Sequence, residues 1–178
     1  YQPSRIWNEV ALNGGLFYKR DAGRKLYRRS MYTYWKRSAP MPSMVAFDAP
    51  TREKCVIQRP RTNTPMQALV TMNDVQFVEA ARVFAQRILN QGGVDFDSQL
   101  DYAFLLATSR PADELRKNVF RKLYNSQLKE FSRDKKRAED LPKFGEAKRD
   151  ESIDLAQHAA WTTVASAILN LDEVLSKE

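Results

Sequence analysis

The segment "TPMQALVTMNDVQFVEAARVFAQRILNQGG", residues 64–93, has the strongest helical pattern in the chain. Thr64 followed by Pro65 is typical of a helix start, because the hydroxyl caps the first turn and proline fits the first helical position. Asp74 is a second capping residue. After it, apolar residues recur at the spacing of one helix face: Phe77, Val78, Ala81, Phe84, Ala85 and Ile88. The segment therefore predicts two successive helices, with the buried face of the first formed by Met66, Leu69, Val70 and Met72.

Helical patterns outnumber strand patterns in the remainder of the sequence as well. We expect an all-α protein of about six helices in an irregular bundle, with a less regular N-terminal part. We treat residues 1–178 as a single domain with four parts: an irregular, proline-rich part at 1–60, a helical core at 64–133, a charged mobile loop at 134–151, and a C-terminal helix at 152–178. Within the first part, short helices are predicted at 5–12 and 24–36. In the core, the last helix is expected to bury Leu115, Val119, Leu123 and Phe131.

Length and composition are those of an ordinary folded domain. A chain of 178 residues with 43% hydrophobic residues is long enough to bury a core. No apolar run approaches the roughly 18 residues that a membrane-spanning helix needs, and the first residues do not resemble a signal peptide. The sequence starts at Tyr1 without a methionine, so we expect it to be part of a longer or processed protein.

Positive charge is concentrated in one segment, residues 19–37. This segment contains eight basic residues and one acidic residue, so it accounts for the whole net charge of +7. Aromatic side chains are interleaved with the charges, a combination that also suits single-stranded nucleic acid. The alternative is a helix with buried aromatics and solvated arginines. We take as candidate docking surface Arg24, Lys25, Arg28, Arg29, Lys36 and Arg37.

A second polar group surrounds the start of the segment that opened this section. Its members are Arg59, Arg61, Asn63, Asn73 and Asp74. One interpretation is a structural clasp, in which the arginines pair with Asp74 or Asp48. The other is an anion-binding site at a helix N-terminus. An enzyme acting on a carbohydrate-like substrate, with its site near Arg59, Arg61 and Asp74, is a further hypothesis.

Residues for metal, redox or nucleophilic chemistry are scarce. His158 is the only histidine and Cys55 the only cysteine, so the sequence predicts neither a histidine-rich metal site nor a disulfide within the chain. Asp95, Asp97 and Asp101 lie close together, but they lack the spacing and internal glycine of a calcium loop. We interpret them as helix-capping and first-turn residues. We predict no cofactor-binding or metal-binding residues in this chain, and no catalytic residue can be named.

Three stretches resemble the C-terminal domain of a family of large planctomycete-type proteins. They are "LYRRSMYTYWKRSAPMPSMVAFDAPTREKCVIQRPRTNTPMQALVTMNDVQFVEAARVFAQRIL", "SRPADEL" and "AAWTTVASAILNLDEVLSKE". That domain has no known function. The resemblance implies a parent protein with an N-terminal c-type cytochrome domain, a second uncharacterised domain and in some cases a lectin-like module. It also implies an extracytoplasmic location, periplasmic or at the cell surface, and haem c on another domain. His158 stands where the family usually has an apolar residue.

These observations favour a non-catalytic interaction or scaffold module over an enzyme. Expected partners are other domains of the parent chain, a redox protein or a polysaccharide. Nucleic acid is the remaining alternative, through the basic segment at 19–37.

Overall fold

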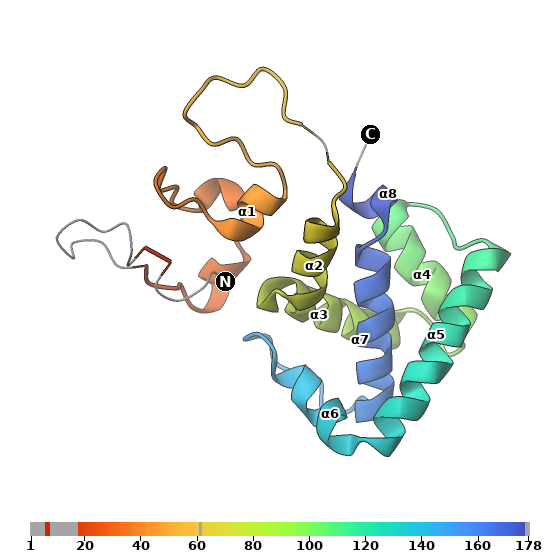
Figure 1. Cartoon of the computed structure of the whole chain (residues 1–178). Helices are drawn as coiled ribbons and strands as arrows, with labels where there is room; N and C mark the ends of the chain where they lie inside the picture. Colours follow the sequence, from red (N-terminus) through yellow and green to blue (C-terminus); the bar gives the residue numbers. More distant parts are fainter. Residues whose placement is uncertain (1–5, 8–17, 61, 177–178) are drawn as a thin grey trace. The chain divides into compact units, whose positions relative to one another are not determined.

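The computed structural model describes residues 6–7, 18–60 and 62–176, and in this part of the chain every regular element is helical. The predicted all-α class is therefore confirmed. Eight α-helices occur among the described residues: α1 (Pro42–Ala46), α2 (Pro65–Asn73), α3 (Val75–Gln91), α4 (Phe96–Thr108), α5 (Glu114–Arg133), α6 (Lys135–Asp140), α7 (Leu155–Leu169) and α8 (Asp172–Leu175) (Figure 1). Short 3₁₀ helices cover Gly23–Tyr27, Ser30–Tyr32 and Leu141–Lys143. None of the described helices combines the length and hydrophobicity needed to cross a bilayer.

Internal contacts group the chain into two compact units. The N-terminal unit comprises residues 1–70 and the C-terminal unit residues 71–178. The first contains the basic segment and the proline-rich region. The second contains α3 to α8.

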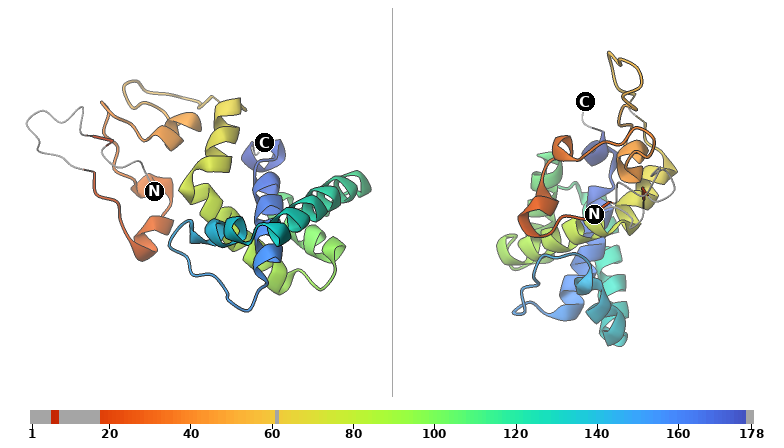
Figure 2. Two further views of the ribbon diagram at one scale, coloured as in Figure 1. Left: turned by 60° about the horizontal axis from the view of Figure 1, so that its bottom comes forward. Right: turned by 90° about the vertical axis from the view of Figure 1, so that its left-hand side faces the viewer.

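In the C-terminal unit, α7 runs through the middle and packs against α3, α4, α5 and α6 (Figure 1). The further views show that α5, in teal, runs at an angle to α7, against which it packs (Figure 2). At the centre of this packing the Trp161 side chain is fully buried. Its ring centroid lies 5.3 Å from that of Phe96 and 5.4 Å from that of Tyr124. Burial of aromatic side chains of this size is a major source of core stability.

Five helices of the C-terminal unit begin in the same way, with an aspartate whose side chain accepts a hydrogen bond from a backbone N–H of the first turn. These caps satisfy donors that have no partner within the helix. They are Asp74 for α3, Asp95 for α4, Asp113 for α5, Asp134 for α6 and Asp154 for α7. The prediction for Asp74 is confirmed, and Asp95 has the capping role expected of its acidic cluster.

Some expected elements differ. The segment at 134–151, predicted as a charged loop, begins with α6 and a 3₁₀ helix, and Ala138 is buried. The C-terminal helix is divided: α7 ends at Leu169 and α8 starts at Asp172. Residues 24–36 do not form the predicted α-helix, but two 3₁₀ helices. The helix predicted at 5–12 falls largely outside the described residues.

Predicted buried faces were wrong in two helices. In α2 the apolar side chains of Met66, Leu69 and Met72 are exposed, whereas Gln67 and Thr71 are buried. In α5 the predicted Leu115 and Val119 are exposed and Phe120 is buried instead, whereas the predicted burial of Phe131 is confirmed. The predicted inward residues Ala81, Ala85 and Ile88 of α3 are buried, as expected.

Candidate functional site

Asp48 organises a polar cluster in the N-terminal unit. Asp48 directly follows α1 and its C-cap residue Phe47, and has a left-handed backbone with φ of 57°. Aspartate is one of the few non-glycine residues that adopt this conformation readily. One carboxylate oxygen of Asp48 accepts hydrogen bonds from the backbone N–H of Thr62 at 2.9 Å and from its hydroxyl at 2.7 Å. The Thr62 hydroxyl bond, followed by the amide bond, lowers the pKa of Asp48 and keeps it ionised.

Arg59 lies at the same place but bonds to the main chain. Its Nε donates to the carbonyl oxygen of Asp48 at 3.3 Å, and its Nη2 donates to that of Phe47 at 3.0 Å. These carbonyl groups follow the last turn of α1, where no helical N–H is available to them. Arg59 therefore fastens the end of α1 and is directed at carbonyl groups, not at the Asp48 carboxylate.

The start of α2 adjoins this cluster through a reciprocal pair of hydrogen bonds. The backbone N–H of Gln67 donates to the Thr64 hydroxyl at 3.3 Å, and the Thr64 N–H donates to the Gln67 side-chain oxygen at 3.1 Å. This is a capping box, and the spacing Thr-x-x-Gln is its sequence signal. The Gln67 amide also donates to the Thr62 hydroxyl at 3.1 Å. Gln67 is thereby buried in place of its apolar neighbours. The apolar pattern of the sequence does not predict this.

Two residues of the predicted polar group, Arg59 and Asp74, serve different helix ends. Arg59 fastens the end of α1, while Asp74 caps α3 through a 2.9 Å bond from the Gln76 N–H. Asn73 is the last residue of α2, and both it and Asn63 have interaction partners. Arg61 lies outside the described residues. Among the residues described, no group of three or more His, Cys, Asp or Glu side chains is arranged to hold a metal ion.

The basic segment of the N-terminal unit is exposed to solvent. Its two 3₁₀ helices bury no residue, and within the described part of the chain four of its cations form no ion pair: Arg24, Lys25, Arg28 and Arg29. Two others have neighbours, since Arg37 lies 3.8 Å from Glu53 and Lys36 lies over the Trp7 ring at 5.7 Å from its centroid. Trp7 also contacts Tyr34 edge-on, with 5.4 Å between ring centroids. The aromatics thus anchor the end of the segment, and the four cations named above remain available to a partner.

A groove of about 310 Å³ opens beside this segment, and we call it the Trp35 groove. It lies within the N-terminal unit and brings together the second 3₁₀ helix, α1 and the loop that follows α1. Its lining residues are mainly apolar: Ser30, Met31, Trp35, Met44, Phe47, Ala49, Pro50, Arg52 and Arg59. Of these, only Arg59 was among the site residues predicted from sequence.

The C-terminal unit has a polar site of its own on α3. The side chains of Glu79, Arg82, Gln86 and Asn90, spaced to share one helix face, bind the segment at 145–150. We call them the α3 polar stripe. The Glu79 carboxylate accepts the backbone N–H groups of Glu146 at 2.8 Å and Ala147 at 2.6 Å, and Gln86 accepts that of Asp150 at 3.0 Å. Glu79 and Arg82 are only 3% and 1% exposed, although both are charged.

His158 of α7 borders the polar stripe. Its Nε2 lies 3.0 Å from the carbonyl oxygen of Arg82, so Nε2 is the nitrogen that carries the proton. Its Nδ1 is buried and has no hydrogen-bond partner within the described residues. Burial lowers the pKa of His158, and the positive charges of Arg149 and Arg82 add to this effect. His158 is therefore a neutral core residue.

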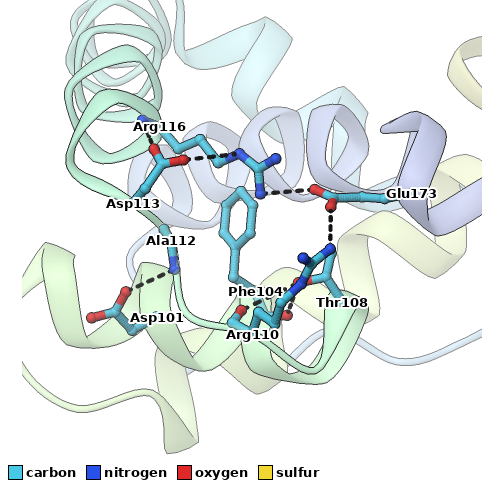
Figure 3. Close-up of polar contacts among 8 residues, drawn as sticks. All are labelled: Asp101, Phe104, Thr108, Arg110, Ala112, Asp113, Arg116 and Glu173. Carbon is cyan, nitrogen blue, oxygen red and sulfur yellow. Dashed lines mark hydrogen bonds and ion pairs between the residues drawn. The ribbon is translucent and has the colours of Figure 1, made fainter.

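The last polar cluster fixes α8 to the corner between α4 and α5 (Figure 3). The two carboxylate oxygens of Glu173 lie 2.8 Å from Arg116 and 3.1 Å from Arg110. The Arg116 guanidinium also lies over the Phe104 ring, 5.6 Å from its centroid. The side chains form ion pairs with one another across this corner, so we interpret the cluster as structural.

A known family matches most of the chain. Residues 1–124 match PSD1, a family described as "Protein of unknown function (DUF1553)". The chain belongs to the PSD1 family. The matched region includes the basic segment, the Trp35 groove, α2, α3 and α4, and ends within α5. No curated protein and no solved structure matches the chain. Membership in PSD1 therefore carries no activity with it, and the function has to be argued from the site.

Proposed function

We propose that this PSD1 domain is a non-catalytic interaction module that docks through its basic segment onto an acidic surface of another domain or protein. The observation that carries the proposal is the exposure of Arg24, Lys25, Arg28 and Arg29, which form no ion pair within the described part of the chain. The segment at 19–37 holds the whole net charge of +7. Such a concentration of one sign attracts a partner of opposite sign and orients it during encounter.

The hydrogen bonds made by Asp48, Asp74 and Arg59 support a non-catalytic role. Catalytic carboxylates need free oxygens directed at a substrate. The Asp48 carboxylate instead binds Thr62, and the Asp74 carboxylate caps α3. Arg59 bonds to carbonyl oxygens of its own unit. The carbohydrate-active enzyme with a site near Arg59, Arg61 and Asp74 is the alternative, and turnover of a polysaccharide by the purified chain would establish it.

The biological setting of the proposal comes from the resemblance of the quoted stretches to the planctomycete-type domain. On this basis the parent protein is extracytoplasmic, and haem c is carried by another of its domains. The acidic surface then belongs to a neighbouring domain of the parent chain or to a redox partner. The sequence of the complete parent chain tests this setting. A CxxCH haem-attachment motif is expected, and its absence would remove the cytochrome from the proposal.

Docking itself is tested by measuring binding of the chain to the remaining domains of its parent by biolayer interferometry. Affinity should fall steeply between 0.01 M and 0.1 M salt, because the Debye length falls from about 30 Å to about 10 Å. The test variant changes the four unpaired cations to glutamine: Arg24, Lys25, Arg28 and Arg29. A matched control changes four exposed cations of α5 and α6 to glutamine: Lys122, Lys129, Arg133 and Lys136.

The test variant should lose binding while the control retains it. Equal loss in both variants, or no binding of the unchanged chain at 0.01 M salt, would overturn the proposal. Single-stranded oligonucleotide is measured in parallel, since arginines next to exposed tyrosines also suit nucleic acid. Oligonucleotide binding that is stronger than binding to the parent domains would favour that alternative.

A further inference from the structure

The Trp35 groove has the size and lining of a site for one apolar side chain. Its volume of about 310 Å³ is at the lower end of the range for ligand sites in proteins. Met31, Met44 and Phe47 contribute apolar surface, and Met31 is 65% exposed. Methionine side chains are flexible and polarisable, so they adapt to apolar groups of different shape. The groove therefore offers adaptable apolar surface next to the basic segment.

Hydrogen bonds hold the side of the groove formed by the end of α1 and the loop after it. Phe47 is fixed through its carbonyl oxygen by Arg59, at 3.0 Å, and the adjoining Asp48 is fixed by its two bonds to Thr62. Hydrogen bonds of this kind restrict the loop after α1 before any partner arrives. Preorganisation of a site lowers the entropic cost of binding.

The groove is poorly suited to a nucleobase or a sugar. The Arg52 guanidinium lies over the Trp35 ring, 5.3 Å from its centroid, so this face is not open for stacking. Arg52 has a left-handed backbone with φ of 62°, a conformation that is costly for arginine and that persists only where the surroundings maintain it. A sugar would need several hydrogen-bonding groups. Among the lining side chains these are Ser30, the Trp35 indole N–H and two guanidiniums, and Arg59 is already engaged.

Charge around the groove favours a negatively charged partner. The lining includes Arg52 and Arg59 and no carboxylate. Ser30 and Met31 of the lining directly follow Arg28 and Arg29 in the sequence, and these two cations form no ion pair with any described residue. An apolar group that enters the groove is therefore flanked by positive charge, which acidic residues on either side of that group would complement.

We propose that the Trp35 groove binds an acidic peptide segment of a partner protein, with one apolar side chain of that segment inserted between Met31, Met44 and Phe47. This inference rests on the proposed docking function and adds to it the chemistry of the partner. Charge on the basic segment brings the peptide to the surface, and the groove selects peptides that carry an apolar residue among their acidic ones.

Methionine methyl groups report directly on this site. The chain has five methionines, of which Met31 and Met44 line the groove, Met41 is buried, and Met66 and Met72 lie on α2. With ¹³C-labelled methionine methyls, titration of the whole chain with the peptide DEDFEDE should shift the signals of Met31 and Met44. The signals of Met66 and Met72 should stay in place. No variant is needed, so the measurement does not depend on whether a mutant folds.

Measuring the affinity for two matched peptides separates the contribution of the groove to binding from that of electrostatic attraction. DEDFEDE should bind about tenfold more tightly than DEDSEDE, because only the first has an apolar side chain to bury. The variant Met31→Glu should remove this difference by placing a carboxylate at the rim. Met31 is well exposed, so the substitution is compatible with folding, which circular dichroism verifies. Met66→Glu on α2 is the matched control and should leave the preference unchanged.

The outcomes distinguish failure of this inference from failure of the docking function. Equal affinity for both peptides, with no shift of the Met31 or Met44 signals, would overturn the proposal that the groove binds an apolar side chain. Docking by charge would remain intact. No binding of either peptide at 0.01 M salt, together with no binding of the parent domains, would overturn both. If oligo-dT or polygalacturonate shifts the methyl signals of Met31 and Met44 more than DEDFEDE does, the proposal that the occupant is a peptide would be overturned.

Discussion

Replacement of Gly145 by alanine is expected to destabilise the C-terminal unit far more than an ordinary glycine substitution. Gly145 has φ of +89°, and a Cβ at this position would overlap the side-chain carbons of Glu79. Glu79 is 3% exposed and accepts the N–H groups of Glu146 and Ala147. The carboxylate therefore has to leave these donors to make room for the methyl group.

The magnitude follows from two contributions. A left-handed backbone costs an alanine roughly 1–2 kcal/mol. Hydrogen bonds to a charged group are worth roughly 1.5–3 kcal/mol each, and partial loss of the two bonds to Glu79 adds about 2–3 kcal/mol. The expected loss of stability for Gly145→Ala is thus about 4 kcal/mol. Gly93→Ala is the matched control in the same unit, because Gly93 has φ of +98° but its Cβ would meet only Ser98 Cβ, at 3.1 Å.

The assay is urea unfolding followed by circular dichroism at 222 nm, which reports on the helices. With a slope of about 2 kcal/mol/M, Gly145→Ala should lower the urea midpoint by about 2 M, and Gly93→Ala by less than about 1 M. In a Glu79→Ala background the additional cost of Gly145→Ala should shrink to that of the backbone alone, since the obstructing side chain is gone. Equal costs for the two glycine substitutions, or an unchanged cost in the Glu79→Ala background, would refute the reasoning.

Three further predictions concern pH and salt. The pKa of His158 is lowered in the folded protein, so neutral His158 contributes stability at pH values above the ordinary histidine pKa. This stability is lost as the pH falls towards the folded pKa. His158→Gln should therefore flatten this part of the plot of urea midpoint against pH. The lowered pKa of Asp48 means that its contribution is lost only in acid, so the Thr62 amide signal should titrate below the ordinary aspartate range, and not at all in Asp48→Asn. Glu173→Gln should cost about 0.5–1 kcal/mol at low salt, and the difference from the unchanged chain should shrink in 1 M salt as the ion pair with Arg116 is screened.

Several features of the fold follow from residues close together in the sequence. The start of α2 at Thr64 and Pro65, and that of α3 at Asp74, depend on a cap and the turn beside it. The same is true of the apolar stripe of α3, whose members Ala81, Ala85 and Ile88 are buried. Local chemistry of this kind can be interpreted without knowledge of distant parts of the chain.

The failed helix at 24–36 also has a local cause, which the apolar pattern concealed. In a helix, Arg24 would face Arg28 and Lys25 would face Arg29, and like charges four residues apart destabilise a helix. The structure buries none of the residues of the two 3₁₀ helices, so no packing offsets this repulsion. The segment is left exposed, which is also the property on which the proposed docking depends.

The sites themselves depend on contacts between residues far apart in the chain. Whether Glu79 and Arg82 face solvent or the interior is settled by the segment at 145–150, which approaches α3 only in the folded protein. The Trp35 groove likewise needs Met31 and Met44 to meet across a proline-rich stretch. The sequence alone determined where the helices of the C-terminal unit begin and which face of α3 is apolar, because caps and periodicity act within a few residues. Only the tertiary structure decided which polar side chains are buried and where a groove opens, because both depend on which distant segment covers each surface.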